Sequence, residues 1–172
     1  MKGALQQGHG DGLCGIYSLM NFLHTYPNSN WRDANETLKC LFKSCEERGW
    51  LNPHQLTWGY EDYQLIQVIE DQFRNYRMNF AAYFSKDIAE DNGITSFHEL
   101  ADRVAKSSGA LIASWDAKNH WVLVRSIKGK LTVFDSSSAE TVFTLTKSRK
   151  SLTLSGGVAI LPKVREKTGV EI

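Results

Sequence analysis

A cysteine at the start of an apolar helical pattern is the first residue of this sequence that could do covalent chemistry. Cys14 follows a glycine-rich polar segment, and Leu19 and Leu23 recur after it at helical spacing. A helix N-terminus offers backbone N–H groups and a positive dipole end, which stabilise the nucleophilic thiolate. Gly12 and Gly15 leave room beside the sulfur for a substrate backbone and an oxyanion. A buried structural cysteine fits the same pattern, so Cys14 alone leaves both interpretations open.

A histidine and an aspartate at the ends of two predicted strands could complete a catalytic group. His120 opens the apolar run 120–126, and Asp135 follows the run 131–134. Lys128-Gly129-Lys130 between the runs predicts a tight hairpin, which would bring the two side chains together. The imidazole could then take the thiol proton, and the carboxylate could orient the imidazole. Singly, each residue fits a loop or a turn, but with Cys14 they indicate a cysteine-dependent amide hydrolase.

The other patterns place helices in the first part of the chain and strands in the second. Helices are expected at about 14–24, 61–73 and 97–106. A further helix is expected to begin at a cap at Asn30 or Asp33 and to end at Gly49. Strands are expected at 76–84, 110–115, 120–126, 131–134, 141–145 and 158–161. Asn52-Pro53 is interpreted as a turn. This order predicts an α+β fold in which N-terminal helices pack on a C-terminal antiparallel sheet. With 172 residues, we expect a single domain over 1–172.

Composition argues against several other classes of protein. The formal net charge is +1, which gives no electrostatic case for nucleic-acid binding. No apolar run is long enough for a membrane span, and no apolar segment near the start indicates a secretory signal. The three cysteines show no metal-binding spacing, so neither a metal nor another cofactor is expected. We expect a cytoplasmic protein, or an effector secreted by a route that the sequence does not reveal.

Two blocks of sequence resemble the papain-like cysteine hydrolases, and among them most closely the C39-like peptidases. The first block is Gln7 followed by Gly-Asp-Gly-Leu-Cys-Gly at positions 10–15, and the second is Asn-His-Trp-Val-Leu-Val at 119–124 with Val-Phe-Asp at 133–135. The resemblance implies a papain-like fold, Cys14 as nucleophile, His120 as base and Asp135 as the residue that orients it. It also implies Gln7 as the side-chain oxyanion donor, with Gln6 as a competitor for this role.

Four residues around this group are expected to contact a protein or peptide substrate. They are Gly12 and Gly15 beside the sulfur, and Asn119 and Trp121 beside the histidine. Trp115 is expected to pack in the core instead. Nothing in the sequence indicates an oligomeric state.

The resemblance leaves the reaction subclass open. A peptidase is the leading interpretation, but papain-like glutamine deamidases delivered by bacterial pathogens share the same arrangement. Asp11, three residues before Cys14, also resembles the start of the ovarian-tumour class of deubiquitinases, which cleave isopeptide bonds. A catalytically inactive papain-like binding module is the alternative from another class. Residues 27–108 match no family pattern.

Overall fold

The computed structural model describes residues 12–26, 33–115, 120–136, 142–146 and 152–163. Its helices are α1 (Cys14–Thr25), α2 (Ala34–Glu46), α3 (Pro53–Trp58), α4 (Asp62–Asn75), α5 (Ser85–Asp91) and α6 (Phe97–Lys106). Its strands are β1 (Phe80–Phe84), β2 (Ala110–Trp115), β3 (His120–Ile127), β4 (Lys130–Phe134), β5 (Val142–Thr144) and β6 (Leu152–Pro162). Within these ranges, no helix has the length and apolar character needed to cross a bilayer.

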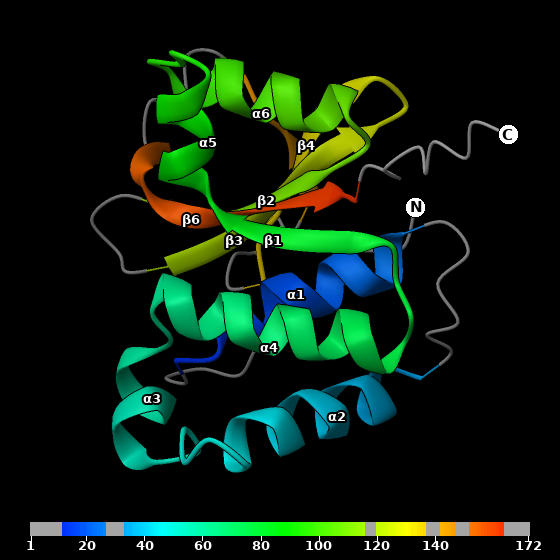
Figure 1. Cartoon of the computed structure of the whole chain (residues 1–172), viewed down its shortest axis with the longest axis vertical. Coiled ribbons are helices and arrows are strands. Elements are labelled where there is room, and N and C mark those ends of the chain that lie inside the picture. The colour runs from blue at the N-terminus through cyan, green and yellow to red at the C-terminus, as the bar shows by residue number, and fades with distance from the viewer. Residues whose placement is uncertain (1–11, 27–32, 116–119, 137–141, 147–151, 164–172) are drawn as a thin grey trace, which may run out of the picture.

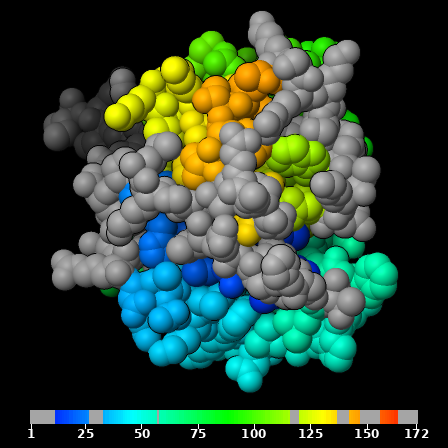
Figure 2. All heavy atoms as spheres, turned by 180° about the vertical axis from the view of Figure 1, so that it is seen from behind, coloured from blue at the N-terminus to red at the C-terminus, as the bar shows by residue number. Residues whose placement is uncertain are grey.

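The strands form one antiparallel sheet with helices on both faces. Its six strands run in the order β1-β6-β2-β3-β4-β5, and every pair is antiparallel. Figure 1 shows α1 and α4 below the sheet, α5 and α6 above it, and α2 and α3 outside α4. Seen from behind, residues of α1 and α2 (blue to cyan) lie below residues of β3 to β5 (yellow to orange), as Figure 2 shows. The predicted α+β class with an antiparallel sheet is confirmed.

Alternation along β3 divides the core between the two faces of the sheet. Trp121 and Leu123 belong to the apolar cluster shared with α1 and α4. Val122 and Val124 belong to the cluster shared with α5 and α6. Successive side chains of a strand point to opposite faces, so this near-continuous apolar run indicates a strand buried on both sides. β3 is therefore packed against helices on both faces, and His120 is its first residue.

α1 lies directly against β3, and this contact sets the position of Cys14. Leu19 and Leu23, on the apolar side of the helix, are completely buried. Ser18, one turn after Cys14, donates its hydroxyl to the carbonyl oxygen of Trp121 at 3.1 Å. The bond joins the first turn of α1 to the start of β3, 103 positions further along the chain.

Four expectations about the elements are corrected by the structure. Asn52 is the N-cap of α3 rather than part of a simple turn, because its side chain accepts from two backbone N–H groups and Pro53 stands at the first helical position. The strand expected at 76–84 begins only at Phe80, since α4 continues to Asn75 and Arg77 has a φ of 51°. α5 was not predicted, and β6 is longer than the expected 158–161.

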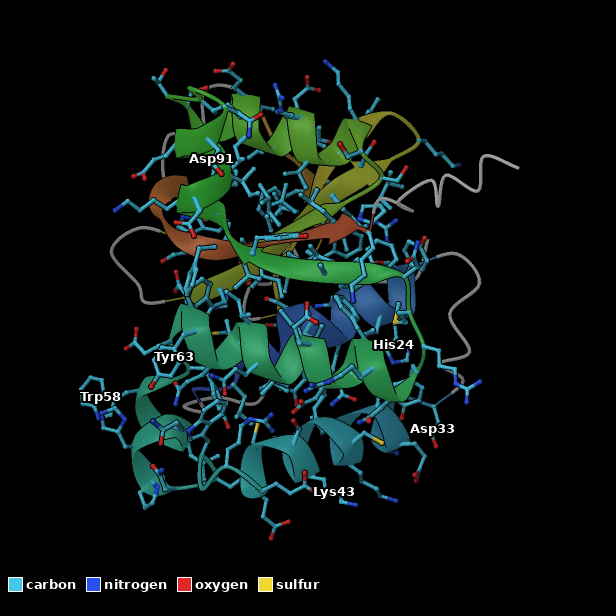
Figure 3. All side chains as sticks on the ribbon, in the orientation of Figure 1. His24, Asp33, Lys43, Trp58, Tyr63 and Asp91 are labelled. Atoms are coloured by element: carbon cyan, nitrogen blue, oxygen red, sulfur yellow. The ribbon has the colours of Figure 1, made fainter. Side chains whose placement is uncertain are left out.

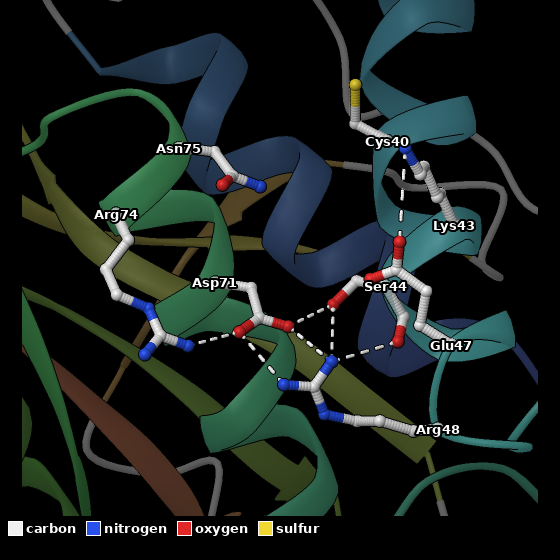
Figure 4. A pocket seen from close by; sticks show the side chains of 8 residues that line it. All are labelled: Cys40, Lys43, Ser44, Glu47, Arg48, Asp71, Arg74 and Asn75. Carbon is white, nitrogen blue, oxygen red and sulfur yellow. Dashed lines mark hydrogen bonds and ion pairs between the residues drawn. The ribbon is translucent and has the colours of Figure 1, made fainter.

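A cluster of charged side chains holds α2 against α4 (Figure 4). Asp71 on α4 forms ion pairs with Arg48 and with Arg74. It also accepts a hydrogen bond from the hydroxyl of Ser44 on α2. Burial raises the pKa of the Asp71 carboxyl, but the hydrogen bonds from Ser44, Arg74 and Arg48 outweigh it and hold the pKa below its ordinary value.

Replacing Asp71 with alanine is expected to lower the free energy of unfolding at pH 7 by about 1–3 kcal/mol, because Arg48 would lose its partner. The Asp71 side chain is 13% exposed, so solvent screens this pair only in part. A carboxyl with a depressed pKa stabilises above its unfolded-state value, near 3.8, and this contribution is lost as the pH falls through the lower folded-state pKa. Urea denaturation at pH 7 and pH 3 measures both effects.

The matched control is Glu47→Gln, which breaks an exposed ion pair between Glu47 and Lys43 at the end of α2. Its effect should stay within about 0.5 kcal/mol at both pH values. An equal loss of stability in the Asp71 and Glu47 variants would contradict the role assigned to Asp71.

Candidate active site

Cys14 is the first residue of α1, as the sequence predicts. Leu13 is the N-cap, and it cannot offer a capping oxygen from its side chain. No acidic side chain lies in the first turn. The Cys14 sulfur is therefore at the positive end of the helix, with no carboxylate from that turn to offset the dipole. Cys14 is only 4% exposed, so its surroundings are largely protein rather than water.

His120 and Asp135 come together at the same edge of the sheet. His120 is the first residue of β3, and Asp135 directly follows β4. The hairpin between these strands turns through Lys128 and Gly129, which both have positive φ, at 50° and 76°. Two such residues form the tight turn that matches the twist of paired strands. The Nε2 atom of His120 lies 2.7 Å from Oδ1 of Asp135, and the two side chains are 11% and 7% exposed.

Cys14 and Asp135 both act on the protonation of His120. Burial lowers the pKa of the imidazole, but hydrogen bonds with Asp135 and Cys14, and the charges of both groups, raise it to about 9. Because Asp135 occupies Nε2, the other ring nitrogen, Nδ1, is the one left for the sulfur. The imidazole is consequently protonated at neutral pH. An imidazolium between the sulfur of Cys14 and the carboxylate of Asp135 can stabilise a thiolate and can later donate a proton.

The two glycines predicted to contact substrate also have packing reasons in this fold. A Cβ atom on Gly12 would lie 2.4 Å from the backbone nitrogen of Gly59, and one on Gly15 would lie 2.7 Å from a methyl carbon of Leu65. Gly12 also donates its N–H to the carbonyl oxygen of Leu56 at 2.6 Å. These contacts bring the start of α1 close to α3 and α4. The expected substrate contact of the two glycines stays a prediction.

Trp121 lies next to His120 and is almost buried. Its indole N–H donates to the carbonyl oxygen of Tyr60 at 3.1 Å. Trp115 packs edge-to-face with Phe143, at 5.7 Å between ring centroids, in the cluster on the other face of the sheet. Gln7, its competitor Gln6, and Asn119 lie outside the described residues, so their predicted roles stay predictions.

Two residues that position the site were missed by the sequence reasoning. Ser18 ties α1 to β3, and the only signal for it is a hydroxyl on the apolar side of a helix. Tyr60 anchors Trp121 through its carbonyl oxygen, and a backbone acceptor leaves no signal in the residue type.

Comparison with solved structures finds a peptidase domain. The peptidase domain of Streptococcus ComA, a bifunctional ABC transporter involved in quorum sensing, matches with a TM-score of 0.52 and 16% identity, and the match covers 95% of this chain and 100% of that one. The chain has a C39-like, papain-like fold. The C39-like resemblance drawn from two short sequence blocks is thereby confirmed for the fold.

A second solved structure is a double glycine motif protease from an AMS/PCAT transporter in complex with the leader peptide. It matches with a TM-score of 0.48 and 16% identity, over 94% of this chain and 93% of that one. No family model and no curated protein matches this sequence. The likeness to solved structures therefore shows the fold of this chain alone.

Proposed function

We propose that this protein is a cysteine peptidase with Cys14 as nucleophile, His120 as base and acid, and Asp135 as the residue that orients the histidine. The single observation that carries the proposal is the hydrogen-bonded series from Cys14 through His120 to Asp135. The order of a thiol at a helix start, an imidazole and a carboxylate supports nucleophilic catalysis. The C39-like fold supports the same reaction.

The reaction follows from these positions. In the resting pair His120 holds the proton and Cys14 is the thiolate, which attacks the carbonyl carbon of an amide, so that a C–S bond forms and the carbonyl oxygen becomes an oxyanion. The oxyanion accepts hydrogen bonds from the backbone N–H of Cys14, at the helix start, and from the side-chain amide of Gln7 in its predicted role. His120 protonates the leaving nitrogen as the C–N bond breaks. Water, deprotonated by His120, then cleaves the thioester and releases a carboxylic acid, which restores the thiolate of Cys14 beside protonated His120.

Mass spectrometry of treated peptides separates this proposal from its rivals. A peptidase cuts the chain, whereas a glutamine deamidase leaves it whole and adds about one dalton at a glutamine. An isopeptidase releases a branch from a lysine side chain. We expect cut chains from a mixed library of unstructured peptides, and no cuts with Cys14→Ala. Whole chains with one-dalton shifts would favour the deamidase, and no change in any substrate would favour an inactive binding module.

Replacing Asp135 with asparagine is expected to lower kcat/KM by about 10²-fold and to move the alkaline limb of its pH profile to lower pH. The carboxylate raises the pKa of His120 toward about 9. Without its charge, the imidazolium loses its proton at a lower pH, and the thiolate–imidazolium pair is lost there. Measuring kcat/KM from pH 5 to 10 gives the position of the limb.

The control for this experiment is Asp33→Asn at the N-cap of α2, which removes a carboxylate away from the site. Its alkaline limb should coincide with that of the wild type. An unchanged limb in Asp135→Asn would contradict the proposed coupling between Asp135 and His120.

A further inference from the structure

A pocket lies where the end of α3 and the start of α4 meet β2 and β3. Its volume is about 280 Å³, and it is lined mainly by Trp58, Tyr60, Glu61, Asp62, Ser114 and Trp121. Sites for whole small molecules commonly occupy about 300–1,000 Å³. The pocket is therefore of a size that suits one long side chain of a bound peptide.

Two connections place this pocket within reach of Cys14. Trp121 in its wall directly follows His120 in β3. On the other wall, Asp62 precedes Leu65 by three residues on α4, and the Leu65 side chain packs directly against Gly15. Three residues of a helix span about 4.5 Å, and one extended peptide residue spans about 3.5 Å. A side chain within a few residues of the scissile bond could therefore enter the pocket.

Two carboxylates give the pocket a negative charge. Within the described part of the chain, neither Glu61 nor Asp62 forms an ion pair. One oxygen of Asp62 accepts from the backbone N–H of Gly157 at 2.9 Å, which binds but does not neutralise it. The cluster around Asp71 differs in this respect, because two arginines balance its charge.

Aromatic rings complete the chemistry of the pocket. Trp58, the last residue of α3, is 69% exposed, and Figure 3 shows it at the outer edge of the molecule near Tyr63. The indole N–H of Trp121 is already bound to Tyr60, so this ring presents apolar surface rather than a donor. Indole faces bind the stems of lysine and arginine and attract their cations.

We infer that this pocket is a specificity subsite that binds a lysine or arginine side chain of the peptide substrate. The inference rests on the proposed peptidase function. The cation would lie against Glu61 and Asp62, and its aliphatic stem against Trp58 and Trp121. Two carboxylates that form no ion pair among the described residues would repel an acidic residue at the same position and would leave a neutral residue without an ionic partner.

Peptides that differ at one position test this subsite. Each position near the cut is occupied in turn by arginine, norleucine or glutamate, and kcat/KM is measured for each. We expect one position at which arginine exceeds norleucine by at least about tenfold, with glutamate poorest. Asp62→Asn and Glu61→Gln keep an acceptor oxygen at each place but remove the charge. The double variant should reduce the ratio of arginine to norleucine to about two or less.

The ratio distinguishes specificity from a structural role. If Glu61 and Asp62 only support the start of α4, both peptides lose activity together, the ratio stays constant and the inference fails. Asp91→Asn on α5 removes one carboxylate from the opposite side of the sheet and should leave the ratio unchanged. Wild-type cleavage with no preference for a cationic residue would overturn the subsite and leave the peptidase proposal standing.

A binding measurement keeps the two proposals separate. Cys14→Ala protein is titrated with the peptide Ala-Ala-Arg-Ala-Ala and with its norleucine counterpart, and intrinsic tryptophan fluorescence is followed. Tighter binding of the arginine peptide, abolished by the Glu61 and Asp62 changes, supports the pocket even if no peptide is cut. Equal binding of the two peptides overturns the pocket whatever the enzyme's activity.

Discussion

Replacing Cys14 with alanine is expected to abolish peptide cleavage, with a loss in kcat of about 10⁴-fold or more. The reason is that the variant has no atom to form the thioester, and the other groups of the site cannot supply one. Removing one sulfur from the first turn of α1 should leave the fold in place, because the burial of this helix depends on side chains such as Leu19 and Leu23. Cleavage of a peptide library, followed by mass spectrometry, measures the loss.

Cys40→Ala is the matched control, because it removes a partly buried thiol from α2 and leaves the site untouched. It should cut peptides at the wild-type rate. Thermal melting followed by circular dichroism should show cooperative unfolding for both variants. Turnover retained by Cys14→Ala, measured on protein free of wild type, would end the proposal.

The sequence predicted best those elements whose ends carry a local signal. The helix at 97–106 was predicted with its bounds because Ser96 caps it by accepting the N–H of Glu99. α3 was missed because Asn-Pro suits both a turn and the start of a helix, so Asn52-Pro53 does not distinguish the two. α5 was missed because it is short and mostly polar, and it is held in place by the sheet rather than by its own pattern.

The residues of the candidate site also differ in whether a local sequence signal marks them. Cys14, His120 and Asp135 each stand at an element end, and one hairpin was enough to predict that His120 and Asp135 lie together. The neighbours that come from 52–65 could not be predicted, because they reach the site through backbone contacts and packing. Gly12 meets Leu56 through main-chain atoms, and Gly15 meets Leu65 only because α1 and α4 cross there.

Residues 58–62 would supply a selectivity that the proposed catalytic group lacks. Cys14, His120 and Asp135 could cut any amide, since none of them distinguishes one peptide from another. The inferred subsite from the end of α3 and the start of α4 would add a preference, and it contacts the site through Trp121. Reactivity and selectivity would thus be carried by different parts of the chain, and each can be changed without the other.

Replacing His120 with alanine is expected to lower kcat by about 10³- to 10⁵-fold, because both proton transfers of the reaction lose their carrier. Wild-type kcat/KM should fall as the pH rises through about 9, where the imidazolium loses its proton. Added imidazole should restore part of the activity of the variant, since it can occupy the space left by the ring. His98→Ala on α6, on the other side of the sheet, is the matched control and should keep the wild-type rate and pH profile.

The pH dependence of the free energy of unfolding reports the protonation of His120 independently of activity. Its pKa is raised from 6.5 to about 9 in the folded protein, so its protonation stabilises the fold fully below pH 6.5, and this contribution is lost as the pH rises through 9. The free energy of unfolding of the wild type should therefore decline over that interval, and the decline should be smaller in His120→Ala. If wild-type kcat/KM and the free energy of unfolding decline at the same pH, both report the loss of the proton from His120. An activity limb well below pH 9, with the decline in stability still at 9, would mean that another group controls the reaction.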